Sequence, residues 1–288
     1  MIHARASANI SYKSFVKQRF VMSKSYLAMM AIYIIFYIAS LIYFSVEGRT
    51  RDALLAFAFL LIPPVMLLVE RNLHITMPPL FALGAFYLLI GSTLGSSYDL
   101  YTHVPAWDEL LHGYSGFFFS CIGFVLFESL MGEPKDKKSF VCAMLFGVAF
   151  CLMIGFLWEI FEWAGSTLLG ADMEEDAIVH SFHSYFLSGT HSAAYSVDNI
   201  VNTVITLADG RTIVIDGYLD LGLIDTLDDM IVCLIGAAAY LVFIPVLRKT
   251  SYRLYRTIMP RYAKVETCKH DEYMREPHAA YDFAIGNK

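Results

Sequence analysis

The most constraining feature of the sequence is an uncharged run of eighteen residues, 140–157, that leads directly into two glutamates. A run of this length can cross the hydrocarbon core of a bilayer as a helix. Glu159 and Glu162 follow it three residues apart, and therefore lie on one face of that helix. Their like charges repel, and each costs about 2.5–3.5 kcal/mol near the middle of a bilayer. We therefore expect a metal, a shared proton or a basic partner to neutralise the pair.

The composition extends this expectation to the whole chain, because 57% of its residues are hydrophobic. Such a chain is typical of an all-α polytopic membrane protein rather than a soluble globule. Apolar runs predict six transmembrane helices, at 26–46, 53–69, 78–96, 107–131, 139–169 and 223–247. Pro63 and Pro64 are expected to kink the second helix, and Pro78 and Pro79 to begin the third.

The distribution of basic residues predicts the orientation of these helices. With the N-terminus inside the cell, 18 of the 21 Lys and Arg residues fall on the cytoplasmic side. The predicted layout is a basic cytoplasmic segment (1–25), five helices within 26–169, an external insertion (170–222), a sixth helix (223–247) and a basic cytoplasmic tail (248–288). Both termini are then cytoplasmic.

The insertion contains two β-branched runs, within 201–216, on either side of Asp209 and Gly210. This pattern predicts a β-hairpin with a type I′ turn. Three histidines precede it, at His180, His183 and His191. They could bind a metal, although loop histidines without nearby acids or cysteines more often have no specific role.

Two further helices begin with acidic groups. Asp108 and His112 lie four residues apart near the start of the fourth helix, so they share a face. Glu109 beside them is explained by the positive N-terminal end of the helix. The sixth helix begins with three aspartates at spacings of three and four residues: Asp225, Asp228 and Asp229.

In the predicted topology, all three acidic groups lie at the external ends of their helices. No Lys or Arg occurs in 72–134, 139–210 or 212–247, so basic residues within these helices cannot neutralise the acids. A bound cation, protonated carboxyls, water, or a loop arginine (Arg49, Arg51 or Arg211) remain as alternatives. Carboxylates with one imidazole suit Mg²⁺, Mn²⁺, Ca²⁺ or Zn²⁺. The candidate ligands of such a divalent metal are Asp108, His112, Glu159, Glu162 and Asp229.

The motifs WDELLH, WEIFEW and GYLDLGLIDTLDDM, within about 107–247, are similar to those of the YjdF-like bacterial membrane proteins. More distantly, the chain resembles the VanZ-like pattern D-x-x-x-H, E-x-x-Q and D-x-x-x-N-x-x-G. It departs from that pattern at Glu162, which stands in place of Gln, and at Cys233, which stands in place of Asn. The resemblance implies a multi-pass protein of the bacterial inner membrane, and the VanZ-like family is associated with cell-envelope stress.

The leading hypothesis is a metal-assisted hydrolase or transferase that acts on a lipid or lipid-linked cell-envelope substrate. His112 would be its general base or a metal ligand, Glu159 and Glu162 ligands or an acid–base pair, and Asp108, Asp225 and Asp229 the rest of the site. The alternatives are a proton- or cation-coupled transporter and a non-enzymatic accessory protein that binds a lipid or an antibiotic. We expect membrane lipid, and no nucleic acid, among the partners.

The predicted topology can be tested with an impermeant thiol reagent on intact cells. Ser188→Cys, in the insertion, should be labelled, and Ser139→Cys, at the start of the fifth helix, should not, because the basic residues place them on opposite sides of the membrane. Labelling of Ser139→Cys alone would invert the topology.

Overall fold

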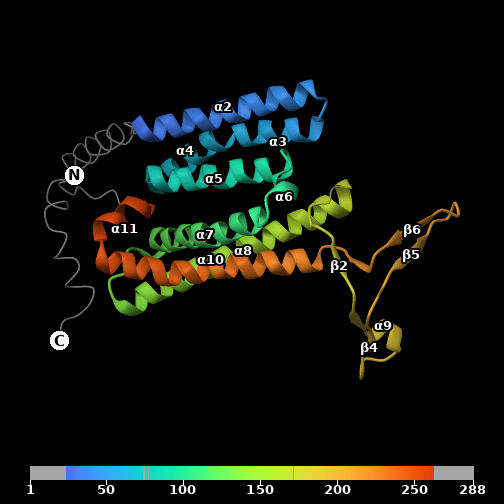
Figure 1. Cartoon of the computed structure of the whole chain (residues 1–288). Coiled ribbons are helices and arrows are strands. Elements are labelled where there is room, and N and C mark those ends of the chain that lie inside the picture. Colours follow the sequence, from blue (N-terminus) through green and yellow to red (C-terminus); the bar gives the residue numbers. More distant parts are fainter. Residues whose placement is uncertain (1–23, 74, 77, 171, 263–288) are drawn as a thin grey trace, which may run out of the picture. The chain divides into compact units, whose positions relative to one another are not determined.

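The computed structural model describes residues 24–262 apart from 74, 77 and 171, so most of the predicted N-terminal segment and the end of the tail lie outside it. Its helices are α2 (Lys24–Val46), α3 (Thr50–Leu60), α4 (Ile62–Leu73), α5 (Pro79–Ser96), α6 (Leu100–His103), α7 (Trp107–Met131), α8 (Lys137–Leu169), α9 (Tyr185–Ser188), α10 (Leu223–Thr250) and α11 (Tyr252–Ile258) (Figure 1). Six stretches of helix are long and apolar enough to cross a membrane, which confirms the predicted fold class.

The two proline pairs act as predicted. The second span is interrupted at Leu61, between α3 and α4, immediately before Pro63 and Pro64. Pro78 is the N-cap of α5 and Pro79 occupies its first turn, where a missing amide donor costs least.

The chain divides into two compact units, which are described separately. The first comprises the described parts of residues 1–153 and 232–288, and the second comprises residues 154–231. The first unit is helical apart from one short strand pair, in which β1 (Ile75–Thr76) runs antiparallel to β8 (Arg261–Tyr262).

In the first unit, buried tyrosines of α2 join it to α3 and α5, which run beside it (Figure 1). The Tyr33 hydroxyl donates a hydrogen bond to the Phe59 carbonyl oxygen, 2.9 Å away in α3. The Tyr37 hydroxyl donates to the Leu89 carbonyl oxygen of α5 at 2.7 Å. Both tyrosines are fully buried, so each ring packs in the core while its polar end is satisfied by a neighbouring backbone.

Glycines bring α7 and α10 into close contact in the same unit. A Cβ atom at Gly236 would overlap the Gly113 carbonyl oxygen, and one at Gly116 would overlap the Cys233 carbonyl oxygen. Small residues allow such approaches between helices in membranes, where van der Waals packing drives association. These contacts therefore require glycine at Gly116 and Gly236.

The second unit consists of the end of α8, the insertion and the start of α10. Its strands form three antiparallel pairs: β2 (Ala177–Val179) with β7 (Tyr218–Asp220), β3 (Phe182–Ser184) with β4 (Tyr195–Val197), and β5 (Thr203–Thr206) with β6 (Thr212–Ile215). The last pair is the predicted hairpin, which Figure 1 shows as a long two-stranded ribbon.

The prediction of a type I′ turn in this hairpin is wrong. That turn needs a positive φ at both central residues, and Gly210 has a φ of +83° whereas Asp209 does not have a positive φ. The Leu207 amide bonds to the Arg211 carbonyl oxygen at 2.8 Å, and the Gly210 amide to the Leu207 carbonyl oxygen at 2.9 Å. These bonds close a three-residue loop with glycine in the left-handed position, the next most common hairpin type.

The glycine contacts predict the effect of added methyl groups. Gly236→Ala should destabilise the protein by about 1–3 kcal/mol, because the new Cβ must push α7 and α10 apart. The control is Gly113→Ala on the facing helix, whose Cβ would lie 3.3 Å from the Val232 Cγ1 atom, a side chain that can adjust. Thermal unfolding in detergent measures the difference, and equal stabilities for the two variants would contradict this account of the packing.

Candidate functional site

Three predicted site residues come together in the second unit. Glu159 and Glu162 lie on α8 and Asp229 lies on α10, and each offers a carboxylate oxygen within 4.8 Å of the others. Glu159 is 6% exposed and Asp229 is 3% exposed, while Glu162 is half-buried with a buried Oε2 atom. We refer to these three residues as the carboxylate cluster.

The only Lys or Arg residue within 154–231 is engaged elsewhere. The Arg211 Nε atom donates to the Asp209 Oδ2 atom at 2.7 Å, at the tip of the hairpin, where the arginine side chain is 77% exposed. Hydrogen bonds from the Arg211 backbone amide and guanidinium lower the pKa of the Asp209 carboxyl. Arg211 therefore pairs with its own turn rather than with the carboxylate cluster.

Arg49, another arginine considered as a counter-charge, is held within the first unit. Its Nε atom donates to the Asp52 Oδ2 atom at 2.8 Å, and its Nη2 atom to the Ser97 carbonyl oxygen at 2.7 Å. The Ser97 hydroxyl also donates to the Asp52 Oδ1 atom at 2.9 Å. This network joins the turn between α2 and α3 to the end of α5, which gives Arg49 a structural role.

The other two aspartates of α10 differ from Asp229. Asp225 accepts a hydrogen bond from the Glu175 amide at 3.1 Å, so it connects the helix to the first residues of the insertion. Asp228 is exposed. Asp229, Cys233 and Gly236 follow one another at helical spacing and are all buried, so they form one packing face of α10. Membership of this face distinguishes Asp229 from the exposed Asp228.

Two contacts that the sequence did not indicate attach the insertion to its helices. The Ser166 hydroxyl, near the end of α8, accepts hydrogen bonds from the amides of Met173 and Glu174 at 3.0 and 3.3 Å. The Asp220 Oδ2 atom accepts from the Ile224 amide at 2.8 Å and so caps the start of α10. A carboxylate shortly before a helix is the only sequence signal for the second contact.

The insertion beside α10 is itself acidic. The pKa of the Asp176 carboxyl is raised by desolvation and then by the charges of Asp172 and Asp220. Repulsion among these acids favours the approach of cations or protons to this part of the second unit.

Asp108 and His112 form a pair within the first unit, on the first two turns of α7. The His112 Nε2 atom lies 3.7 Å from the Asp108 Oδ1 atom, and the two side chains are 14% and 30% exposed. At this distance the carboxylate is an electrostatic neighbour of the ring, and a hydrogen bond of the kind that orients ligating imidazoles would need a closer approach. Glu109 is exposed, which agrees with its interpretation as an ordinary residue of a helix start.

The three histidines of the insertion have local partners. The His180 Nδ1 atom lies 2.8 Å from the Ile200 carbonyl oxygen, and the His183 Nδ1 atom lies 3.0 Å from the Ser196 hydroxyl. The His191 ring lies 5.3 Å from the ring of Tyr185. Within the described part of the chain, no convergent group of metal-ligand atoms includes a histidine of the insertion.

The carboxylate cluster has the dimensions of a site for a hard cation. Oxygen ligands on opposite sides of one cation lie about 4.2 Å apart around Mg²⁺ and about 4.6–5.2 Å apart around Ca²⁺. The three carboxylate oxygens, all within 4.8 Å of one another, therefore have the spacing of ligands around Ca²⁺, and around Mg²⁺ they would have to approach to about 4.2 Å or less. Three ligands leave positions for water or for a substrate oxygen.

Comparison with family models identifies the relationship of the chain. The family described as "Predicted membrane protein (DUF2238)" matches residues 27–250 and contains YjdF. The match confirms the YjdF-like resemblance and does not support the VanZ-like one. Comparison with curated proteins and with solved structures found no match. Because the family model covers most of the sequence, the chain belongs to the DUF2238 family of predicted membrane proteins.

Proposed function

We propose that Glu159, Glu162 and Asp229 bind one divalent cation and that this centre acts on a lipid or lipid-linked substrate of the bacterial cell envelope. The observation that carries the proposal is the convergence, within 4.8 Å, of three carboxylates from two apolar helices. We also propose, as the sequence predicts, that the protein lies in the bacterial inner membrane and that this site faces outward.

The electrostatics of the carboxylate cluster support a bound cation. Two unit charges at this separation repel by about 3–4 kcal/mol at the effective dielectric constant typical of protein sites. Arg211, the one Lys or Arg residue of the second unit, is paired with Asp209. A divalent ion offsets the repulsion of all three carboxylates at once, whereas protonation must neutralise them one at a time.

The surroundings of the carboxylate cluster favour an amphiphilic substrate. On α8, Trp158, Phe161 and Trp163 are 39%, 50% and 53% exposed, and on α10, Leu227 and Ile231 are 52% and 54% exposed. These apolar side chains flank buried carboxylates in helices long enough to cross a membrane. A lipid can therefore approach through the bilayer and present a polar headgroup to the centre.

The bound cation would polarise an ester or phosphoester oxygen of the substrate and lower the pKa of a coordinated water. On the predicted topology, we assign His112 as the general base or an additional ligand, and Asp108 as the residue that orients its ring. Asp225, bonded to the Glu175 amide, is assigned to hold the insertion against α10.

Metal analysis tests the cation site. Detergent-purified protein should retain about one divalent ion per chain, or bind one in calorimetric titrations with Mg²⁺, Mn²⁺, Ca²⁺ or Zn²⁺. Asp229→Asn should weaken binding by at least about tenfold, because it removes a charged ligand. Asp228→Asn is the matched control, since it removes an equal charge from the adjacent exposed position. Equal affinities in the two variants would exclude the carboxylate cluster as the site.

A proton- or cation-coupled transporter is the second candidate, because buried carboxylates can also carry exchangeable protons. The two functions differ in purified protein, where no gradient exists. If the protein is an enzyme, incubation with radiolabelled envelope lipids and divalent metals should yield a changed lipid. His112→Gln should abolish that turnover, and Asp108→Asn should reduce it less. Glu109→Gln, in the exposed first turn of α7, should leave it unchanged.

The contrary result is equally specific. Absence of product with every metal, combined with dissipation of a pH gradient by proteoliposomes that His112→Gln stops, would refute the enzyme and support the transporter. If the protein retains a lipid or an antibiotic unchanged and shows neither lipid turnover nor pH-gradient dissipation, this result would indicate a non-enzymatic accessory protein.

A further inference from the structure

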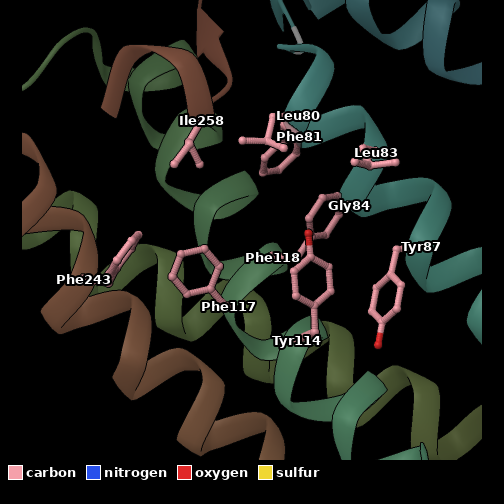
Figure 2. A pocket seen from close by; sticks show the side chains of 10 residues that line it. All are labelled: Leu80, Phe81, Leu83, Gly84, Tyr87, Tyr114, Phe117, Phe118, Phe243 and Ile258. Carbon is pink, nitrogen blue, oxygen red and sulfur yellow. The ribbon is translucent and has the colours of Figure 1, made fainter. Parts of the chain in front are cut away.

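A second feature, independent of the carboxylate cluster, is an apolar cavity of about 500 Å³ in the first unit. Figure 2 shows that it lies among α5, α7, α10 and α11, and the lining residues that the structure describes are all uncharged. Its volume falls within the range of small-molecule sites in proteins.

Aromatic rings hold the walls of this cavity in place. Phe81 of α5 and Phe118 of α7 stack with ring centroids 4.3 Å apart. Tyr87 and Tyr114 meet edge to face at 5.2 Å. The Tyr114 hydroxyl lies where a Cβ atom of Gly84 would stand, so the close approach of α5 and α7 depends on this glycine. Such walls cannot close easily over the empty space.

The cavity opens toward the surroundings of the helices. Leu80, Leu83 and Phe243, which line it, are 48%, 47% and 47% exposed. In a membrane protein, this opening faces hydrocarbon rather than water. The occupant that can enter from the side is therefore an acyl chain.

Helix α11 closes one side of the cavity and connects it to basic residues. Tyr255 and Met259 are buried in the core, so the chain folds back after α10, and Ile258 lines the cavity beside Leu80 (Figure 2). The Arg248 guanidinium lies 5.9 Å from the Tyr255 ring and 4.5 Å from the Phe140 ring near the start of α8. This contact brings together the basic ends of three helices: Lys137 and Lys138 of α8, Arg248 and Lys249 of α10, and Arg253 of α11.

We propose that this cavity binds an acyl chain of an anionic phospholipid, whose headgroup contacts the basic residues at the α8, α10 and α11 ends. Charge complementarity selects the headgroup, because basic residues next to a membrane attract anionic lipids. The fixed aromatic walls retain the chain. The site differs in both residues and chemistry from the carboxylate cluster.

Lipid analysis of the full-length protein tests the site. Protein purified in mild detergent from a bacterial membrane should retain about one anionic phospholipid per chain in native mass spectrometry. Leu83→Trp should fill the cavity and reduce retention at least about fivefold. Leu234→Trp is the matched control, because Leu234 is also a half-exposed leucine (48%) of a spanning helix but does not line the cavity. Leu80→Trp is the second filling variant, in case Leu83→Trp does not fold.

The headgroup is tested separately in nanodiscs that contain equal amounts of phosphatidylglycerol and phosphatidylcholine. Wild-type protein should retain phosphatidylglycerol preferentially. The double variant Lys249→Gln/Arg253→Gln should still bind one lipid. Its preference for phosphatidylglycerol over phosphatidylcholine should fall by roughly fivefold for each charge removed. Equal retention by Leu83→Trp and Leu234→Trp, or no headgroup preference in the wild type, would overturn the proposal.

Discussion

The mutual repulsion of Glu159, Glu162 and Asp229 is the interaction on which the account of the site depends. Buried acids of like charge are unfavourable in an apolar helix pair, so the surrounding structure must hold them together. In the second unit, Ser166 fixes the chain that leaves α8, and Asp225 fixes the start of α10 to the same short segment of the insertion. The insertion thus joins the two helix ends that carry the carboxylates.

Packing residues and one residue of the proposed site share one face of α10. Asp229, Cys233 and Gly236 are spaced by four and three residues and are all buried. Gly236 meets the backbone of Gly113 on α7, so this face needs a residue without a side chain one turn beyond Cys233.

The six spans were predictable within a few residues, because hydrophobic length and the breaks at Pro63 and Pro78 are local properties. The hairpin was predictable for the same reason, but its turn type depends on one φ angle, at Asp209, which the neighbouring chain decides. The sequence could not separate Asp225, Asp228 and Asp229, because their spacing fits several faces and only tertiary packing selects one. Helix α11 was missed, since its basic residues resemble a solvated tail although Tyr255 and Met259 are buried.

The central claim, that three buried carboxylates share a cation, is tested most directly by thermal unfolding with and without divalent ions. In chelator, Glu162→Gln should unfold at a higher temperature than the wild type, because it removes one of the repelling charges. With a divalent ion at a hundred times its dissociation constant, the wild type should gain about 2.7 kcal/mol and the variant less, so the difference in unfolding temperature between them should shrink. The claim would be contradicted if Glu162→Gln were less stable in chelator, or if both proteins gained equally from the ion.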